Sequence, residues 1–505
     1  MLDNLIRRRD PAQRSGNGQV GDYSASLHTD PEAIYLRLPV PLQHVACSLV
    51  GWRTKRTRYG GDFRRVLADA EARTYWAPDD IASFRDRRLA ELVSEAAATL
   101  PFYRDRLHAA GTSPSDIQTL GDLSALPVLT KAEVQEHTRE LISSHAANSR
   151  GVRTVHTGGT TGGGLRFPVT LLAVQEQWAI WWRYRGWHGI RFGTWCALFA
   201  GRSVVPSSQT RPPFWRLNFP GRQLLFSGYH MRGENLSSYL GELRRRRVPW
   251  LHGYPSLLTL LAAHLLESNF DLGYQVQWIT IGAESLLPHQ SDLIRRAFGV
   301  APLQHYGLAE AVANISQCDL GALHVDEDFA AVEFLPLDEP GLYRIVGTNL
   351  SNPAMPLIRY DSQDVATVRE DSSCGCGRPG RVVESINGRR EDYVVRRDGT
   401  FVGRMDHIFK DMVNIREAQI HQTTPGEMTI RVVRGRDYGA DDEHALRREA
   451  AKRVGDDMTV NIEYTTLLPR SRVGKLRLVV SEIAAASIEK PPASEAESAR
   501  RVTLS

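Results

Sequence analysis

The sequence has few cysteines and no long apolar run. Five cysteines among 505 residues are one short of pairing evenly and do not form a disulfide framework, which agrees with a reducing compartment. No stretch approaches the roughly 18 apolar residues that a membrane span needs, and no apolar stretch of the kind found in secretory signals follows the charged N-terminus. We therefore expect a cytoplasmic protein without a membrane span.

The chain also lacks a strong charge of one sign. Its formal net charge of +4 comes from 62 basic and 58 acidic side chains, so no general basic surface for nucleic acid is expected. The arginine-rich runs at residues 53–58 and 244–247 are interpreted as solvated faces. A chain of 505 residues with 42% hydrophobic residues has ample core for two or three domains.

The two ends differ in composition from the middle of the chain. Residues 1–33 and 484–505 are polar and rich in small residues, so both are expected to be disordered. In residues 34–388 short β-rich runs alternate with helical patterns, which predicts an α/β domain with largely parallel sheets. The pattern of residues 389–483 predicts a smaller α+β domain, which is joined to the large domain through a hinge near Gly388.

Two helix boundaries can be predicted in detail. From Asp79 onward apolar residues recur at helical spacing, which predicts a long amphipathic helix that stops before Pro101. Further along, Thr130 is expected to be an N-cap and Glu133 to complete a capping box.

A glycine-rich stretch, HTGGTTGGGLRFPVT at residues 156–170, lacks the features of two common phosphate loops. No lysine follows its last glycine, as a Walker loop requires, and it runs into β-branched residues rather than opening a dinucleotide-binding helix. Clustered glycines allow a backbone to approach a ligand closely, and Thr157, Thr160 and Thr161 add hydroxyl donors. This combination suits a polyphosphate; the alternative is a flexible loop that joins two strands.

A second candidate site follows from cysteine and histidine spacing. Five residues separate Cys318 from His324, and one residue separates Cys374 from Cys376. Together they provide three thiolates and one imidazole, a usual structural zinc set. The candidate ligands are Cys318, His324, Cys374 and Cys376. The alternative is two unrelated half-sites, and Cys47 and Cys196 are expected to be core thiols.

Five further motifs follow the glycine-rich stretch in a fixed order. They are GAES at Gly282, HYGLAE at His305, MPLIRYDSQDVA at Met355, GRRED at Gly388 and PRSRVGKLRLVVS at Pro469. This order resembles the adenylate-forming superfamily of acyl-CoA synthetases, peptide-synthetase adenylation domains and luciferases. The segments FYRDRL, DIQTLGDLSALPVLTK, TNLSNPAMPLIRYD and CGCGR are similar to the branch that contains phenylacetate–coenzyme A ligase and the CapK-type capsule-biosynthesis proteins. The resemblance covers residues 35–483, and members of this branch often show the cysteine and histidine pattern described above.

The resemblance implies an ATP-dependent ligase. A carboxylate attacks the α-phosphorus of ATP, pyrophosphate leaves, and the acyl group of the acyl-adenylate then passes to an acceptor, so that catalysis is mostly positioning and charge neutralisation. In the family the glycine-rich loop wraps the β- and γ-phosphates, which a concave nest of backbone N–H groups can hold. The corresponding residues here are Thr157, Gly158, Gly159, Thr160, Thr161 and Gly162.

The resemblance also implies roles around the nucleotide. Glu310 matches the magnesium-binding glutamate, a hard oxygen ligand of the kind that Mg²⁺ prefers. Tyr306, followed by Gly307, matches the aromatic neighbour of adenine. Asp364 matches the aspartate that accepts both ribose hydroxyls, and Arg389 matches the arginine that assists it. The segment that borders the base and the acyl pocket corresponds to Gly282, Ala283 and Glu284.

The small domain carries the remaining residues of the resemblance. Lys475 matches a mobile lysine that bridges the carboxylate and the α-phosphate, where a flexible ammonium neutralises charge in the transition state. In the family this domain is mobile and swings after adenylation about a hinge acid, which falls on Glu391. Lys475 is therefore expected to serve mainly the first half-reaction.

Three positions depart from the usual family pattern. Gln363 stands where a glycine usually precedes the ribose aspartate, Gly158 takes a position where serine is frequent, and Ala309 replaces a common threonine or serine. None of these changes removes a charged group. They motivate an alternative function, a catalytically silent nucleotide-binding scaffold of a biosynthetic assembly.

The acid and the acceptor stay open at this point. In relatives the acyl pocket is lined by segments that correspond to residues 181–187 and 251–258, whose aromatic residues could stack an aryl ring or simply form core. Arg183 or Arg185 could meet a second anionic group of the acid. The candidate acceptors are coenzyme A, a carrier thiol, or an amine or hydroxyl in polysaccharide or natural-product biosynthesis, and a second copy of the chain is a further candidate partner.

Overall fold

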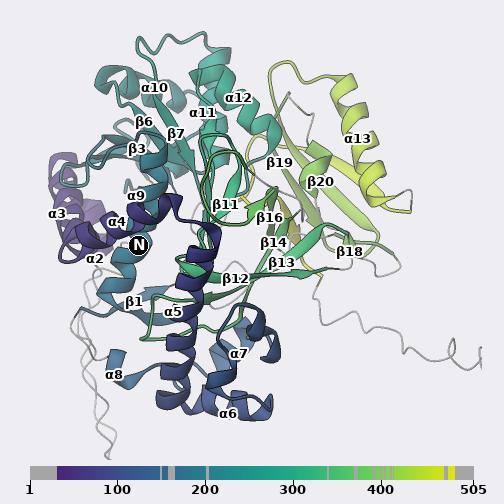
Figure 1. Cartoon of the computed structure of the whole chain (residues 1–505). Coiled ribbons are helices and arrows are strands. Elements are labelled where there is room, and N and C mark those ends of the chain that lie inside the picture. The colour runs from purple at the N-terminus through teal and green to yellow at the C-terminus, as the bar shows by residue number, and fades with distance from the viewer. Residues whose placement is uncertain are drawn as a thin grey trace, which may run out of the picture. The chain divides into compact units, whose positions relative to one another are not determined.

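The computed structural model describes most of the chain in two compact units (Figure 1). The first unit runs to Arg389 and also includes Arg470, and the second contains the described residues within 394–469 and 476–483. The described residues are 31–147, 151–156, 165–200, 204–206, 208–337, 340–368, 374–389, 394–397, 401–402, 405–409, 412, 414–455, 457–470 and 476–483. Both ends that were expected to be disordered lie almost entirely outside these residues.

A six-stranded, mostly parallel sheet forms the centre of the first unit. Its strand order is β4-β5-β3-β6-β7-β8, and only the edge pair β4–β5 is antiparallel. The strands are β3 (Cys196–Ala200), β4 (Trp215–Asn218), β5 (Gln223–Ser227), β6 (Trp250–Gly253), β7 (Trp278–Ile281) and β8 (Pro302–Leu303). The β-rich runs of the sequence thus become parallel strands, as predicted.

Helices cover both faces of this sheet, because neighbouring side chains at the start of β3 and of β6 pack in two different apolar clusters. Ala197 and Leu251 pack with the helices α10 (Asn235–Arg246), α11 (Pro255–Glu267) and α12 (Pro288–Phe298). Cys196 and Trp250 point the other way and pack with α9 (Leu171–Trp187). Alternation between two covered faces is the pattern of a buried sheet in an α/β protein.

Two antiparallel sheets and one hairpin complete the β structure of the first unit. One sheet has the order β15-β11-β10-β9 and the other β12-β13-β14-β16. Their strands are β9 (His305–Gly307), β10 (Asn314–Gln317), β11 (Leu323–Val325), β12 (Ala330–Pro336), β13 (Leu342–Asn349), β14 (Tyr360–Thr367), β15 (Val382–Val383) and β16 (Ser385–Arg389). The hairpin consists of β1 (Arg153–His156) and β2 (Arg166–Val169).

The N-terminal part of the first unit is helical. The predicted long helix is α5, which begins with a proline in its first turn and ends at Thr99 because Pro101 starts the next helix. The predicted capping box is also present: the Glu133 N–H donates to Thr130 Oγ1 over 3.3 Å, and the Thr130 N–H donates to Glu133 Oε2 over 2.8 Å. The helices are α2 (Pro31–Arg37), α3 (Val40–Tyr59), α4 (Phe63–Ala72), α5 (Pro78–Thr99), α6 (Pro101–Ala109), α7 (Lys131–Glu136) and α8 (Ser144–Ala147), with short 3-10 turns at Arg73–Tyr75, Pro114–Asp116, Gly121–Ala125 and Gly228–His230.

The second unit is an α+β arrangement with its own apolar core. A four-stranded sheet of order β21-β20-β19-β22 packs with one helix around Ile430, Leu446 and Val479, each fully buried. Its elements are β17 (Val394–Val395), β18 (Phe401–Val402), a 3-10 turn at Met405–Phe409, β19 (Ile415–Gln422), β20 (Glu427–Arg434), α13 (Ala440–Val454), β21 (Thr459–Tyr464) and β22 (Val479–Ser481). The fold class predicted from the sequence, a large α/β domain followed by a small α+β domain, is confirmed.

None of the helices in the described ranges has the length and apolar character required to cross a membrane.

Candidate active site

Tyr306 and Asp364 form a hydrogen-bonded pair between the two antiparallel sheets. The phenol of Tyr306 on β9 donates to Asp364 Oδ2 on β14 over 2.7 Å. Burial, and then the charge of Asp364, raise the pKa of Tyr306 well above its usual value. The phenol therefore stays protonated and donates to the buried carboxylate.

An irregularity in β14 sets the direction of Asp364. The pairing of β13 with β14 shifts so that Val346 lies opposite Asp361 and Arg344 lies opposite Val365. Gln363 sits inside this bulge with a left-handed φ of +63°, a conformation that glycine adopts more easily than a residue with a side chain. The structure thus gives a physical meaning to the family's usual glycine at this position.

Local hydrogen bonds hold the bulge. The Gln363 N–H donates to Asp361 Oδ1 over 2.9 Å, and the Asp364 N–H donates to Ser362 Oγ over 3.1 Å. On the other side of β14, Asp364 lies opposite Arg389 in the antiparallel register with β16. The two residues expected to act together on ribose are therefore brought together at the level of the backbone.

Glu310 lies in the turn that follows β9. Its half-buried side chain is close enough for its charge to contribute to the raised pKa of Tyr306. The turn is tied to its surroundings: Asn349 Nδ2 donates to the Glu310 carbonyl over 3.2 Å, and Gln177 Nε2 of α9 donates to the Leu308 carbonyl over 2.8 Å. The carboxylates of Glu310 and Asp364 thus lie near the same phenol.

Gly307, between Tyr306 and this turn, has no room for a side chain. A Cβ there would lie 2.8 Å from Asn314 Oδ1 and 3.1 Å from His305 Cε1. Asn314 Oδ1 accepts hydrogen bonds from Trp181 Nε1 over 2.9 Å and pairs with His305 Nε2 at 2.9 Å. Asn314 could not be predicted from the sequence, because no motif singles out a buried amide on a neighbouring strand.

The GAES segment follows the carboxyl end of β7. The Gly282 N–H donates to the Gly253 carbonyl over 3.3 Å, and Ala283 has a left-handed φ of +69°. Glu284 Oε2 accepts from the Ser256 N–H over 3.2 Å, an amide in the first turn of α11. A carboxylate at a helix N-terminus is stabilised by the free N–H groups and the helix dipole.

Part of the expected site lies outside the described residues. This holds for residues 157–164, for Lys475 and for the hinge position Glu391. The glycine-rich stretch joins β1 and β2, whose register places His156 opposite Arg166. Both interpretations of the stretch, as a phosphate loop and as a connection between strands, are compatible with this hairpin.

Of the two arginines considered for a second anionic group, Arg183 is already neutralised. Its guanidinium donates to Asp326 Oδ1 over 2.7 Å and to Asp328 Oδ2 over 2.7 Å, and Arg73 Nε donates to the same Asp328 oxygen over 2.8 Å. All four side chains are buried. The suggestion that Arg183 meets a substrate anion is therefore wrong, because two carboxylates far along the chain occupy it.

Arg185 has a different environment. Its guanidinium carbon lies 4.9 Å from the ring centroid of Trp182, 5.1 Å from that of Trp250 and 5.6 Å from that of Trp178. Within the described ranges its Nε has no hydrogen-bond partner, and burial lowers its pKa. Trp182 and Trp250 are core residues, each less than 9% exposed. Their indoles therefore pack against the Arg185 guanidinium rather than being available to stack on an aryl ring.

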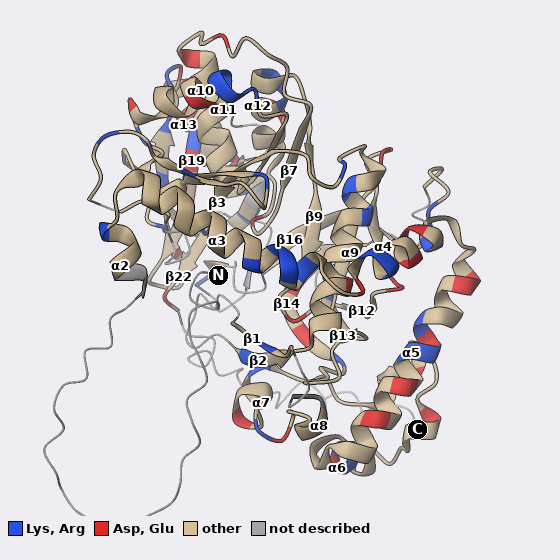
Figure 2. Cartoon of the chain, turned by 90° about the vertical axis from the view of Figure 1, so that its left-hand side faces the viewer, with Lys and Arg blue, Asp and Glu red and all other residues tan. Residues whose placement is uncertain are grey.

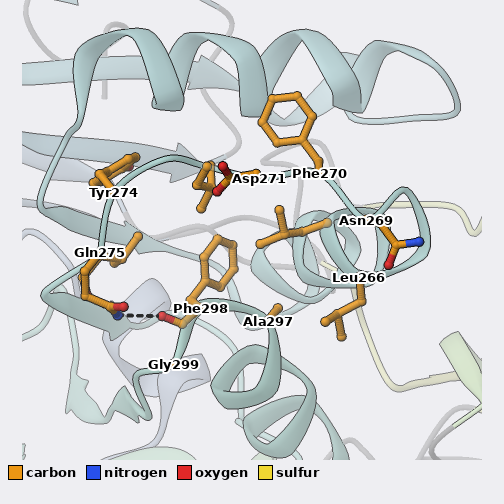
Figure 3. Close-up of a pocket in the computed structure, with 12 residues that line it drawn as sticks. Leu266, Asn269, Phe270, Asp271, Tyr274, Gln275, Ala297, Phe298 and Gly299 are labelled. Atoms are coloured by element: carbon orange, nitrogen blue, oxygen red, sulfur yellow. Dashed lines mark hydrogen bonds between the residues drawn. The ribbon is translucent and has the colours of Figure 1, made fainter.

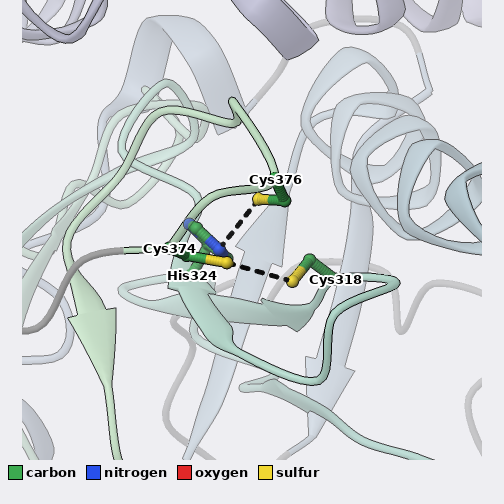
Figure 4. A group of neighbouring side chains, drawn as sticks. All are labelled: Cys318, His324, Cys374 and Cys376. Carbon is green, nitrogen blue, oxygen red and sulfur yellow. Dashed lines mark hydrogen bonds between the residues drawn. The ribbon is translucent and has the colours of Figure 1, made fainter.

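The four candidate zinc ligands come together in space (Figure 4). Cys318 follows β10, His324 lies in β11, and Cys374 and Cys376 come from the loop after β14. Their ligand atoms all lie within 4.8 Å of one another, with Cys318 Sγ 3.7 Å from Cys374 Sγ and Cys376 Sγ 3.4 Å from His324 Nε2. Tetrahedral zinc with bonds of about 2.3 Å to sulfur and about 2.05 Å to nitrogen separates its ligands by roughly 3.8 Å and 3.6 Å. The spacing and the donor set fit one structural zinc ion.

The environment of this cluster favours a charged Cys376 and a neutral His324, but a protonated Cys374. Although burial acts to raise it, hydrogen bonds from Arg378 hold the pKa of Cys376 below its usual value, and the Arg378 N–H lies 3.5 Å from Cys376 Sγ. Burial lowers the pKa of His324 and raises that of Cys374 to about 11. A bound cation would be the natural compensation for the thiolates.

A surface pocket lies apart from these motifs, between the C-terminal ends of α11 and α12 (Figure 3). Its volume is about 360 Å³, and Phe270, Tyr274 and Phe298 contribute its aromatic lining. Gln275 Nε2 closes one side by donating to the Phe298 carbonyl over 2.9 Å. None of the sequence motifs contributes to it.

Comparison with known sequences identifies relatives along most of the chain. Residues 394–482 match the CapK C-terminal domain family. The chain is 23% identical over 459 residues to Protein CapK of Staphylococcus aureus, covering 89% of this chain and 99% of that protein. It is also 23% identical over 452 residues to a phenylacetate-coenzyme A ligase of Thermus thermophilus, covering 80% of this chain and 96% of that protein.

Comparison with solved structures identifies the fold. Crystal structures of 2-hydroxyisobutyryl-CoA ligase in the postadenylation state match with TM-scores of 0.62 and 0.61 at 18% and 19% identity, and the match covers 81% of this chain and 91% of that ligase. These structures hold the adenylates 2-HIB-AMP and R3-HIB-AMP. The chain therefore has the fold of the adenylate-forming ligases. By sequence, it is homologous to CapK and to the phenylacetate–coenzyme A ligases.

Proposed function

We propose that this protein is an ATP-dependent ligase that activates a carboxylic acid as an acyl-adenylate, releases pyrophosphate and passes the acyl group to an acceptor. The observation that carries the proposal is the Tyr306–Asp364 hydrogen bond of 2.7 Å within a fold shared with such ligases. A carboxylate offers about four acceptor positions, so one that accepts from a phenol could also accept from two neighbouring ribose hydroxyls. The ring of Tyr306 then offers adenine an aromatic neighbour.

The other residues of the proposed site would either position the substrates or neutralise their charge. Glu310 would hold Mg²⁺, which neutralises phosphate charge and orients the triphosphate. Thr157 to Gly162 would cradle the β- and γ-phosphates with backbone N–H groups. Lys475 would stabilise the charge that develops as the acid attacks the α-phosphorus, and Arg389 would support Asp364 from the opposite strand.

We propose coenzyme A as the first acceptor to test, because the names of the related phenylacetate–coenzyme A ligases include it. A carrier thiol, or an amine or hydroxyl in polysaccharide or natural-product assembly, are the alternatives. Arg185 is the candidate for a second anionic group of the acid, because no carboxylate in the described part of the chain pairs with it. An acid with a second negative or strongly polar group is therefore the substrate class to test first.

Exchange of labelled pyrophosphate into ATP tests the first half-reaction. The purified full chain is offered aryl, fatty, amino and uronic acids, and products formed with coenzyme A or other acceptors are identified by mass spectrometry. Exchange that depends on one class of acid supports the proposal. Intact ATP binding with no exchange across a broad panel would favour the silent scaffold instead.

A matched pair of variants sharpens this test. Lys475→Ala should abolish exchange and leave ATP binding nearly unchanged, because its ammonium is needed only in the transition state. Lys452→Ala is the control, since that exposed lysine of α13 pairs with Glu449 of the same helix, over 2.7 Å, and should exchange like the parent. Equal activity of both variants would contradict the role given to Lys475.

A further inference from the structure

Helix α3 (Val40–Tyr59) carries its large apolar side chains on the outside. The positions that it buries hold Gln43, Cys47, Gly51 and Arg58. The positions that it exposes include Leu42 at 51%, Val45 at 55%, Leu49 at 63% and Trp52 at 52% exposure. In a surface helix of a globular protein the apolar stripe normally faces the core.

The exposed residues form one continuous stripe. They are spaced three, four and three residues apart, which places them on one side of a helix. Phe219, 57% exposed, extends the stripe sideways, because its N–H donates to Ser48 Oγ of α3 over 3.3 Å. Exposed apolar side chains that are scattered singly need no explanation, whereas a contiguous patch marks an interaction surface.

Positive charge lies at one end of this stripe (Figure 2). The exposed residues Arg53, Lys55 and Arg56 follow Trp52 directly, and the twenty residues of α3 include no aspartate or glutamate. The Arg56 guanidinium lies 4.8 Å from the ring centroid of Trp52, so charge and apolar surface are in direct contact. The surface therefore complements a partner that is apolar and anionic at once.

We propose that the outer face of α3 docks on a membrane surface that contains anionic lipid. Leucine, valine and tryptophan would enter the boundary between headgroups and acyl chains, and the three cations would meet lipid phosphates. A second copy of the chain fits less well, because α3 offers no acidic group to face the cations. This inference concerns a surface outside the proposed active site and does not depend on the ligase activity.

Sedimentation of the full chain with lipid vesicles tests the proposal. One set of vesicles contains phosphatidylcholine alone and the other phosphatidylcholine and phosphatidylglycerol in equal parts. We expect binding to the anionic vesicles that weakens with salt. Leu49→Ser should weaken this binding by at least about tenfold, and Arg53→Glu combined with Lys55→Glu by at least about thirtyfold.

Matched controls separate docking from general effects of substitution. Leu320→Ser removes a leucine of nearly equal exposure, 64%, in the turn after β10. Arg295→Glu combined with Arg296→Glu reverses two exposed cations on α12. Both control variants should bind anionic vesicles like the parent protein. All variants should have the same melting temperature and circular dichroism spectrum as the parent.

Three results would overturn the proposal. The first is no binding to anionic vesicles, and the second is binding that the α3 variants leave unchanged. The third is a dimer in analytical ultracentrifugation that Leu49→Ser dissociates, because a second copy would then cover the face.

Discussion

The phenol of Tyr306 and the carboxylate of Asp364, 2.7 Å apart, join two sheets that share no strand. Tyr306 lies on the edge strand β9 of one sheet, and Asp364 lies on the inner strand β14 of the other. Glu310 follows Tyr306 after one turn. One hydrogen bond thus joins the residue expected to hold the ribose to the strand that leads into the residue expected to hold the metal.

Tyr306→Phe tests this relationship. The variant keeps the ring but removes the donor from the buried carboxylate, and a hydrogen bond to a charged group contributes about 1.5 to 3 kcal/mol. We expect the KM for ATP in pyrophosphate exchange to rise about tenfold or more, with kcat less affected. Tyr75→Phe, at a tyrosine that is 68% exposed, is the control and should behave like the parent.

The regular parts of the fold could be predicted because their signals are local. The helix that ends before Pro101 and the capping box of Thr130 and Glu133 depend on neighbours within four residues. The parallel sheet follows from alternation of short apolar runs with helical patterns. Such local signals predict the observed structure wherever tertiary packing agrees with them.

The candidate site could be predicted only in part, because its partners are distant in sequence. Spacing suggested zinc ligands, but it did not show that Cys318 and Cys376 would meet. No local sequence signal indicated that Asp326 and Asp328 would neutralise Arg183. The exposed Leu49 also departs from the rule that the apolar side of a surface helix faces the core. These features depend on long-range packing, which composition and periodicity do not encode.

Gln363→Gly tests the strain in the bulge of β14. Gln363 has a φ of +63°, and a left-handed conformation costs a residue with a side chain about 1 to 2 kcal/mol. Glycine removes this cost but gains entropy in the unfolded chain, so we expect a net stabilisation of about 0.5 to 1 kcal/mol, seen as a small rise in melting temperature. Gln363→Ala keeps the strain and should not stabilise; a parallel rise in both variants would contradict the explanation.

Metal content tests the cysteine and histidine cluster. We expect about one zinc ion per chain by plasma mass spectrometry of the purified protein, and loss of that ion together with a lower melting temperature after treatment with a strong chelator. Cys376→Ser should lower zinc content and melting temperature in the same way. Cys47→Ser changes a buried thiol outside the cluster and should keep its zinc, so a zinc-free parent protein would refute the assignment.

Asp328→Asn tests the buried ion network and its pH dependence. Although burial acts to raise it, the charges of Arg183 and Arg73 lower the pKa of Asp328 from 3.8 to about 2. Because the folded pKa lies below the unfolded one, the stabilisation is present above about pH 4 and is lost as the pH falls toward 2. Near neutral pH the variant leaves buried guanidinium charge uncompensated and should lower the free energy of unfolding by about 3 to 5 kcal/mol.

The measurement is the difference in unfolding free energy between parent and variant as a function of pH. This difference should stay constant down to about pH 4 and shrink below it, since protonation then removes the same charge from the parent. Asp292→Asn is the control, because Asp292 and Arg295 form an ion pair whose side chains are both 63% exposed, and such pairs contribute only about 0 to 1 kcal/mol. A cost for Asp328→Asn as small as that of the control, or one that grows on acidification, would show that Asp328 does not compensate Arg183 and Arg73.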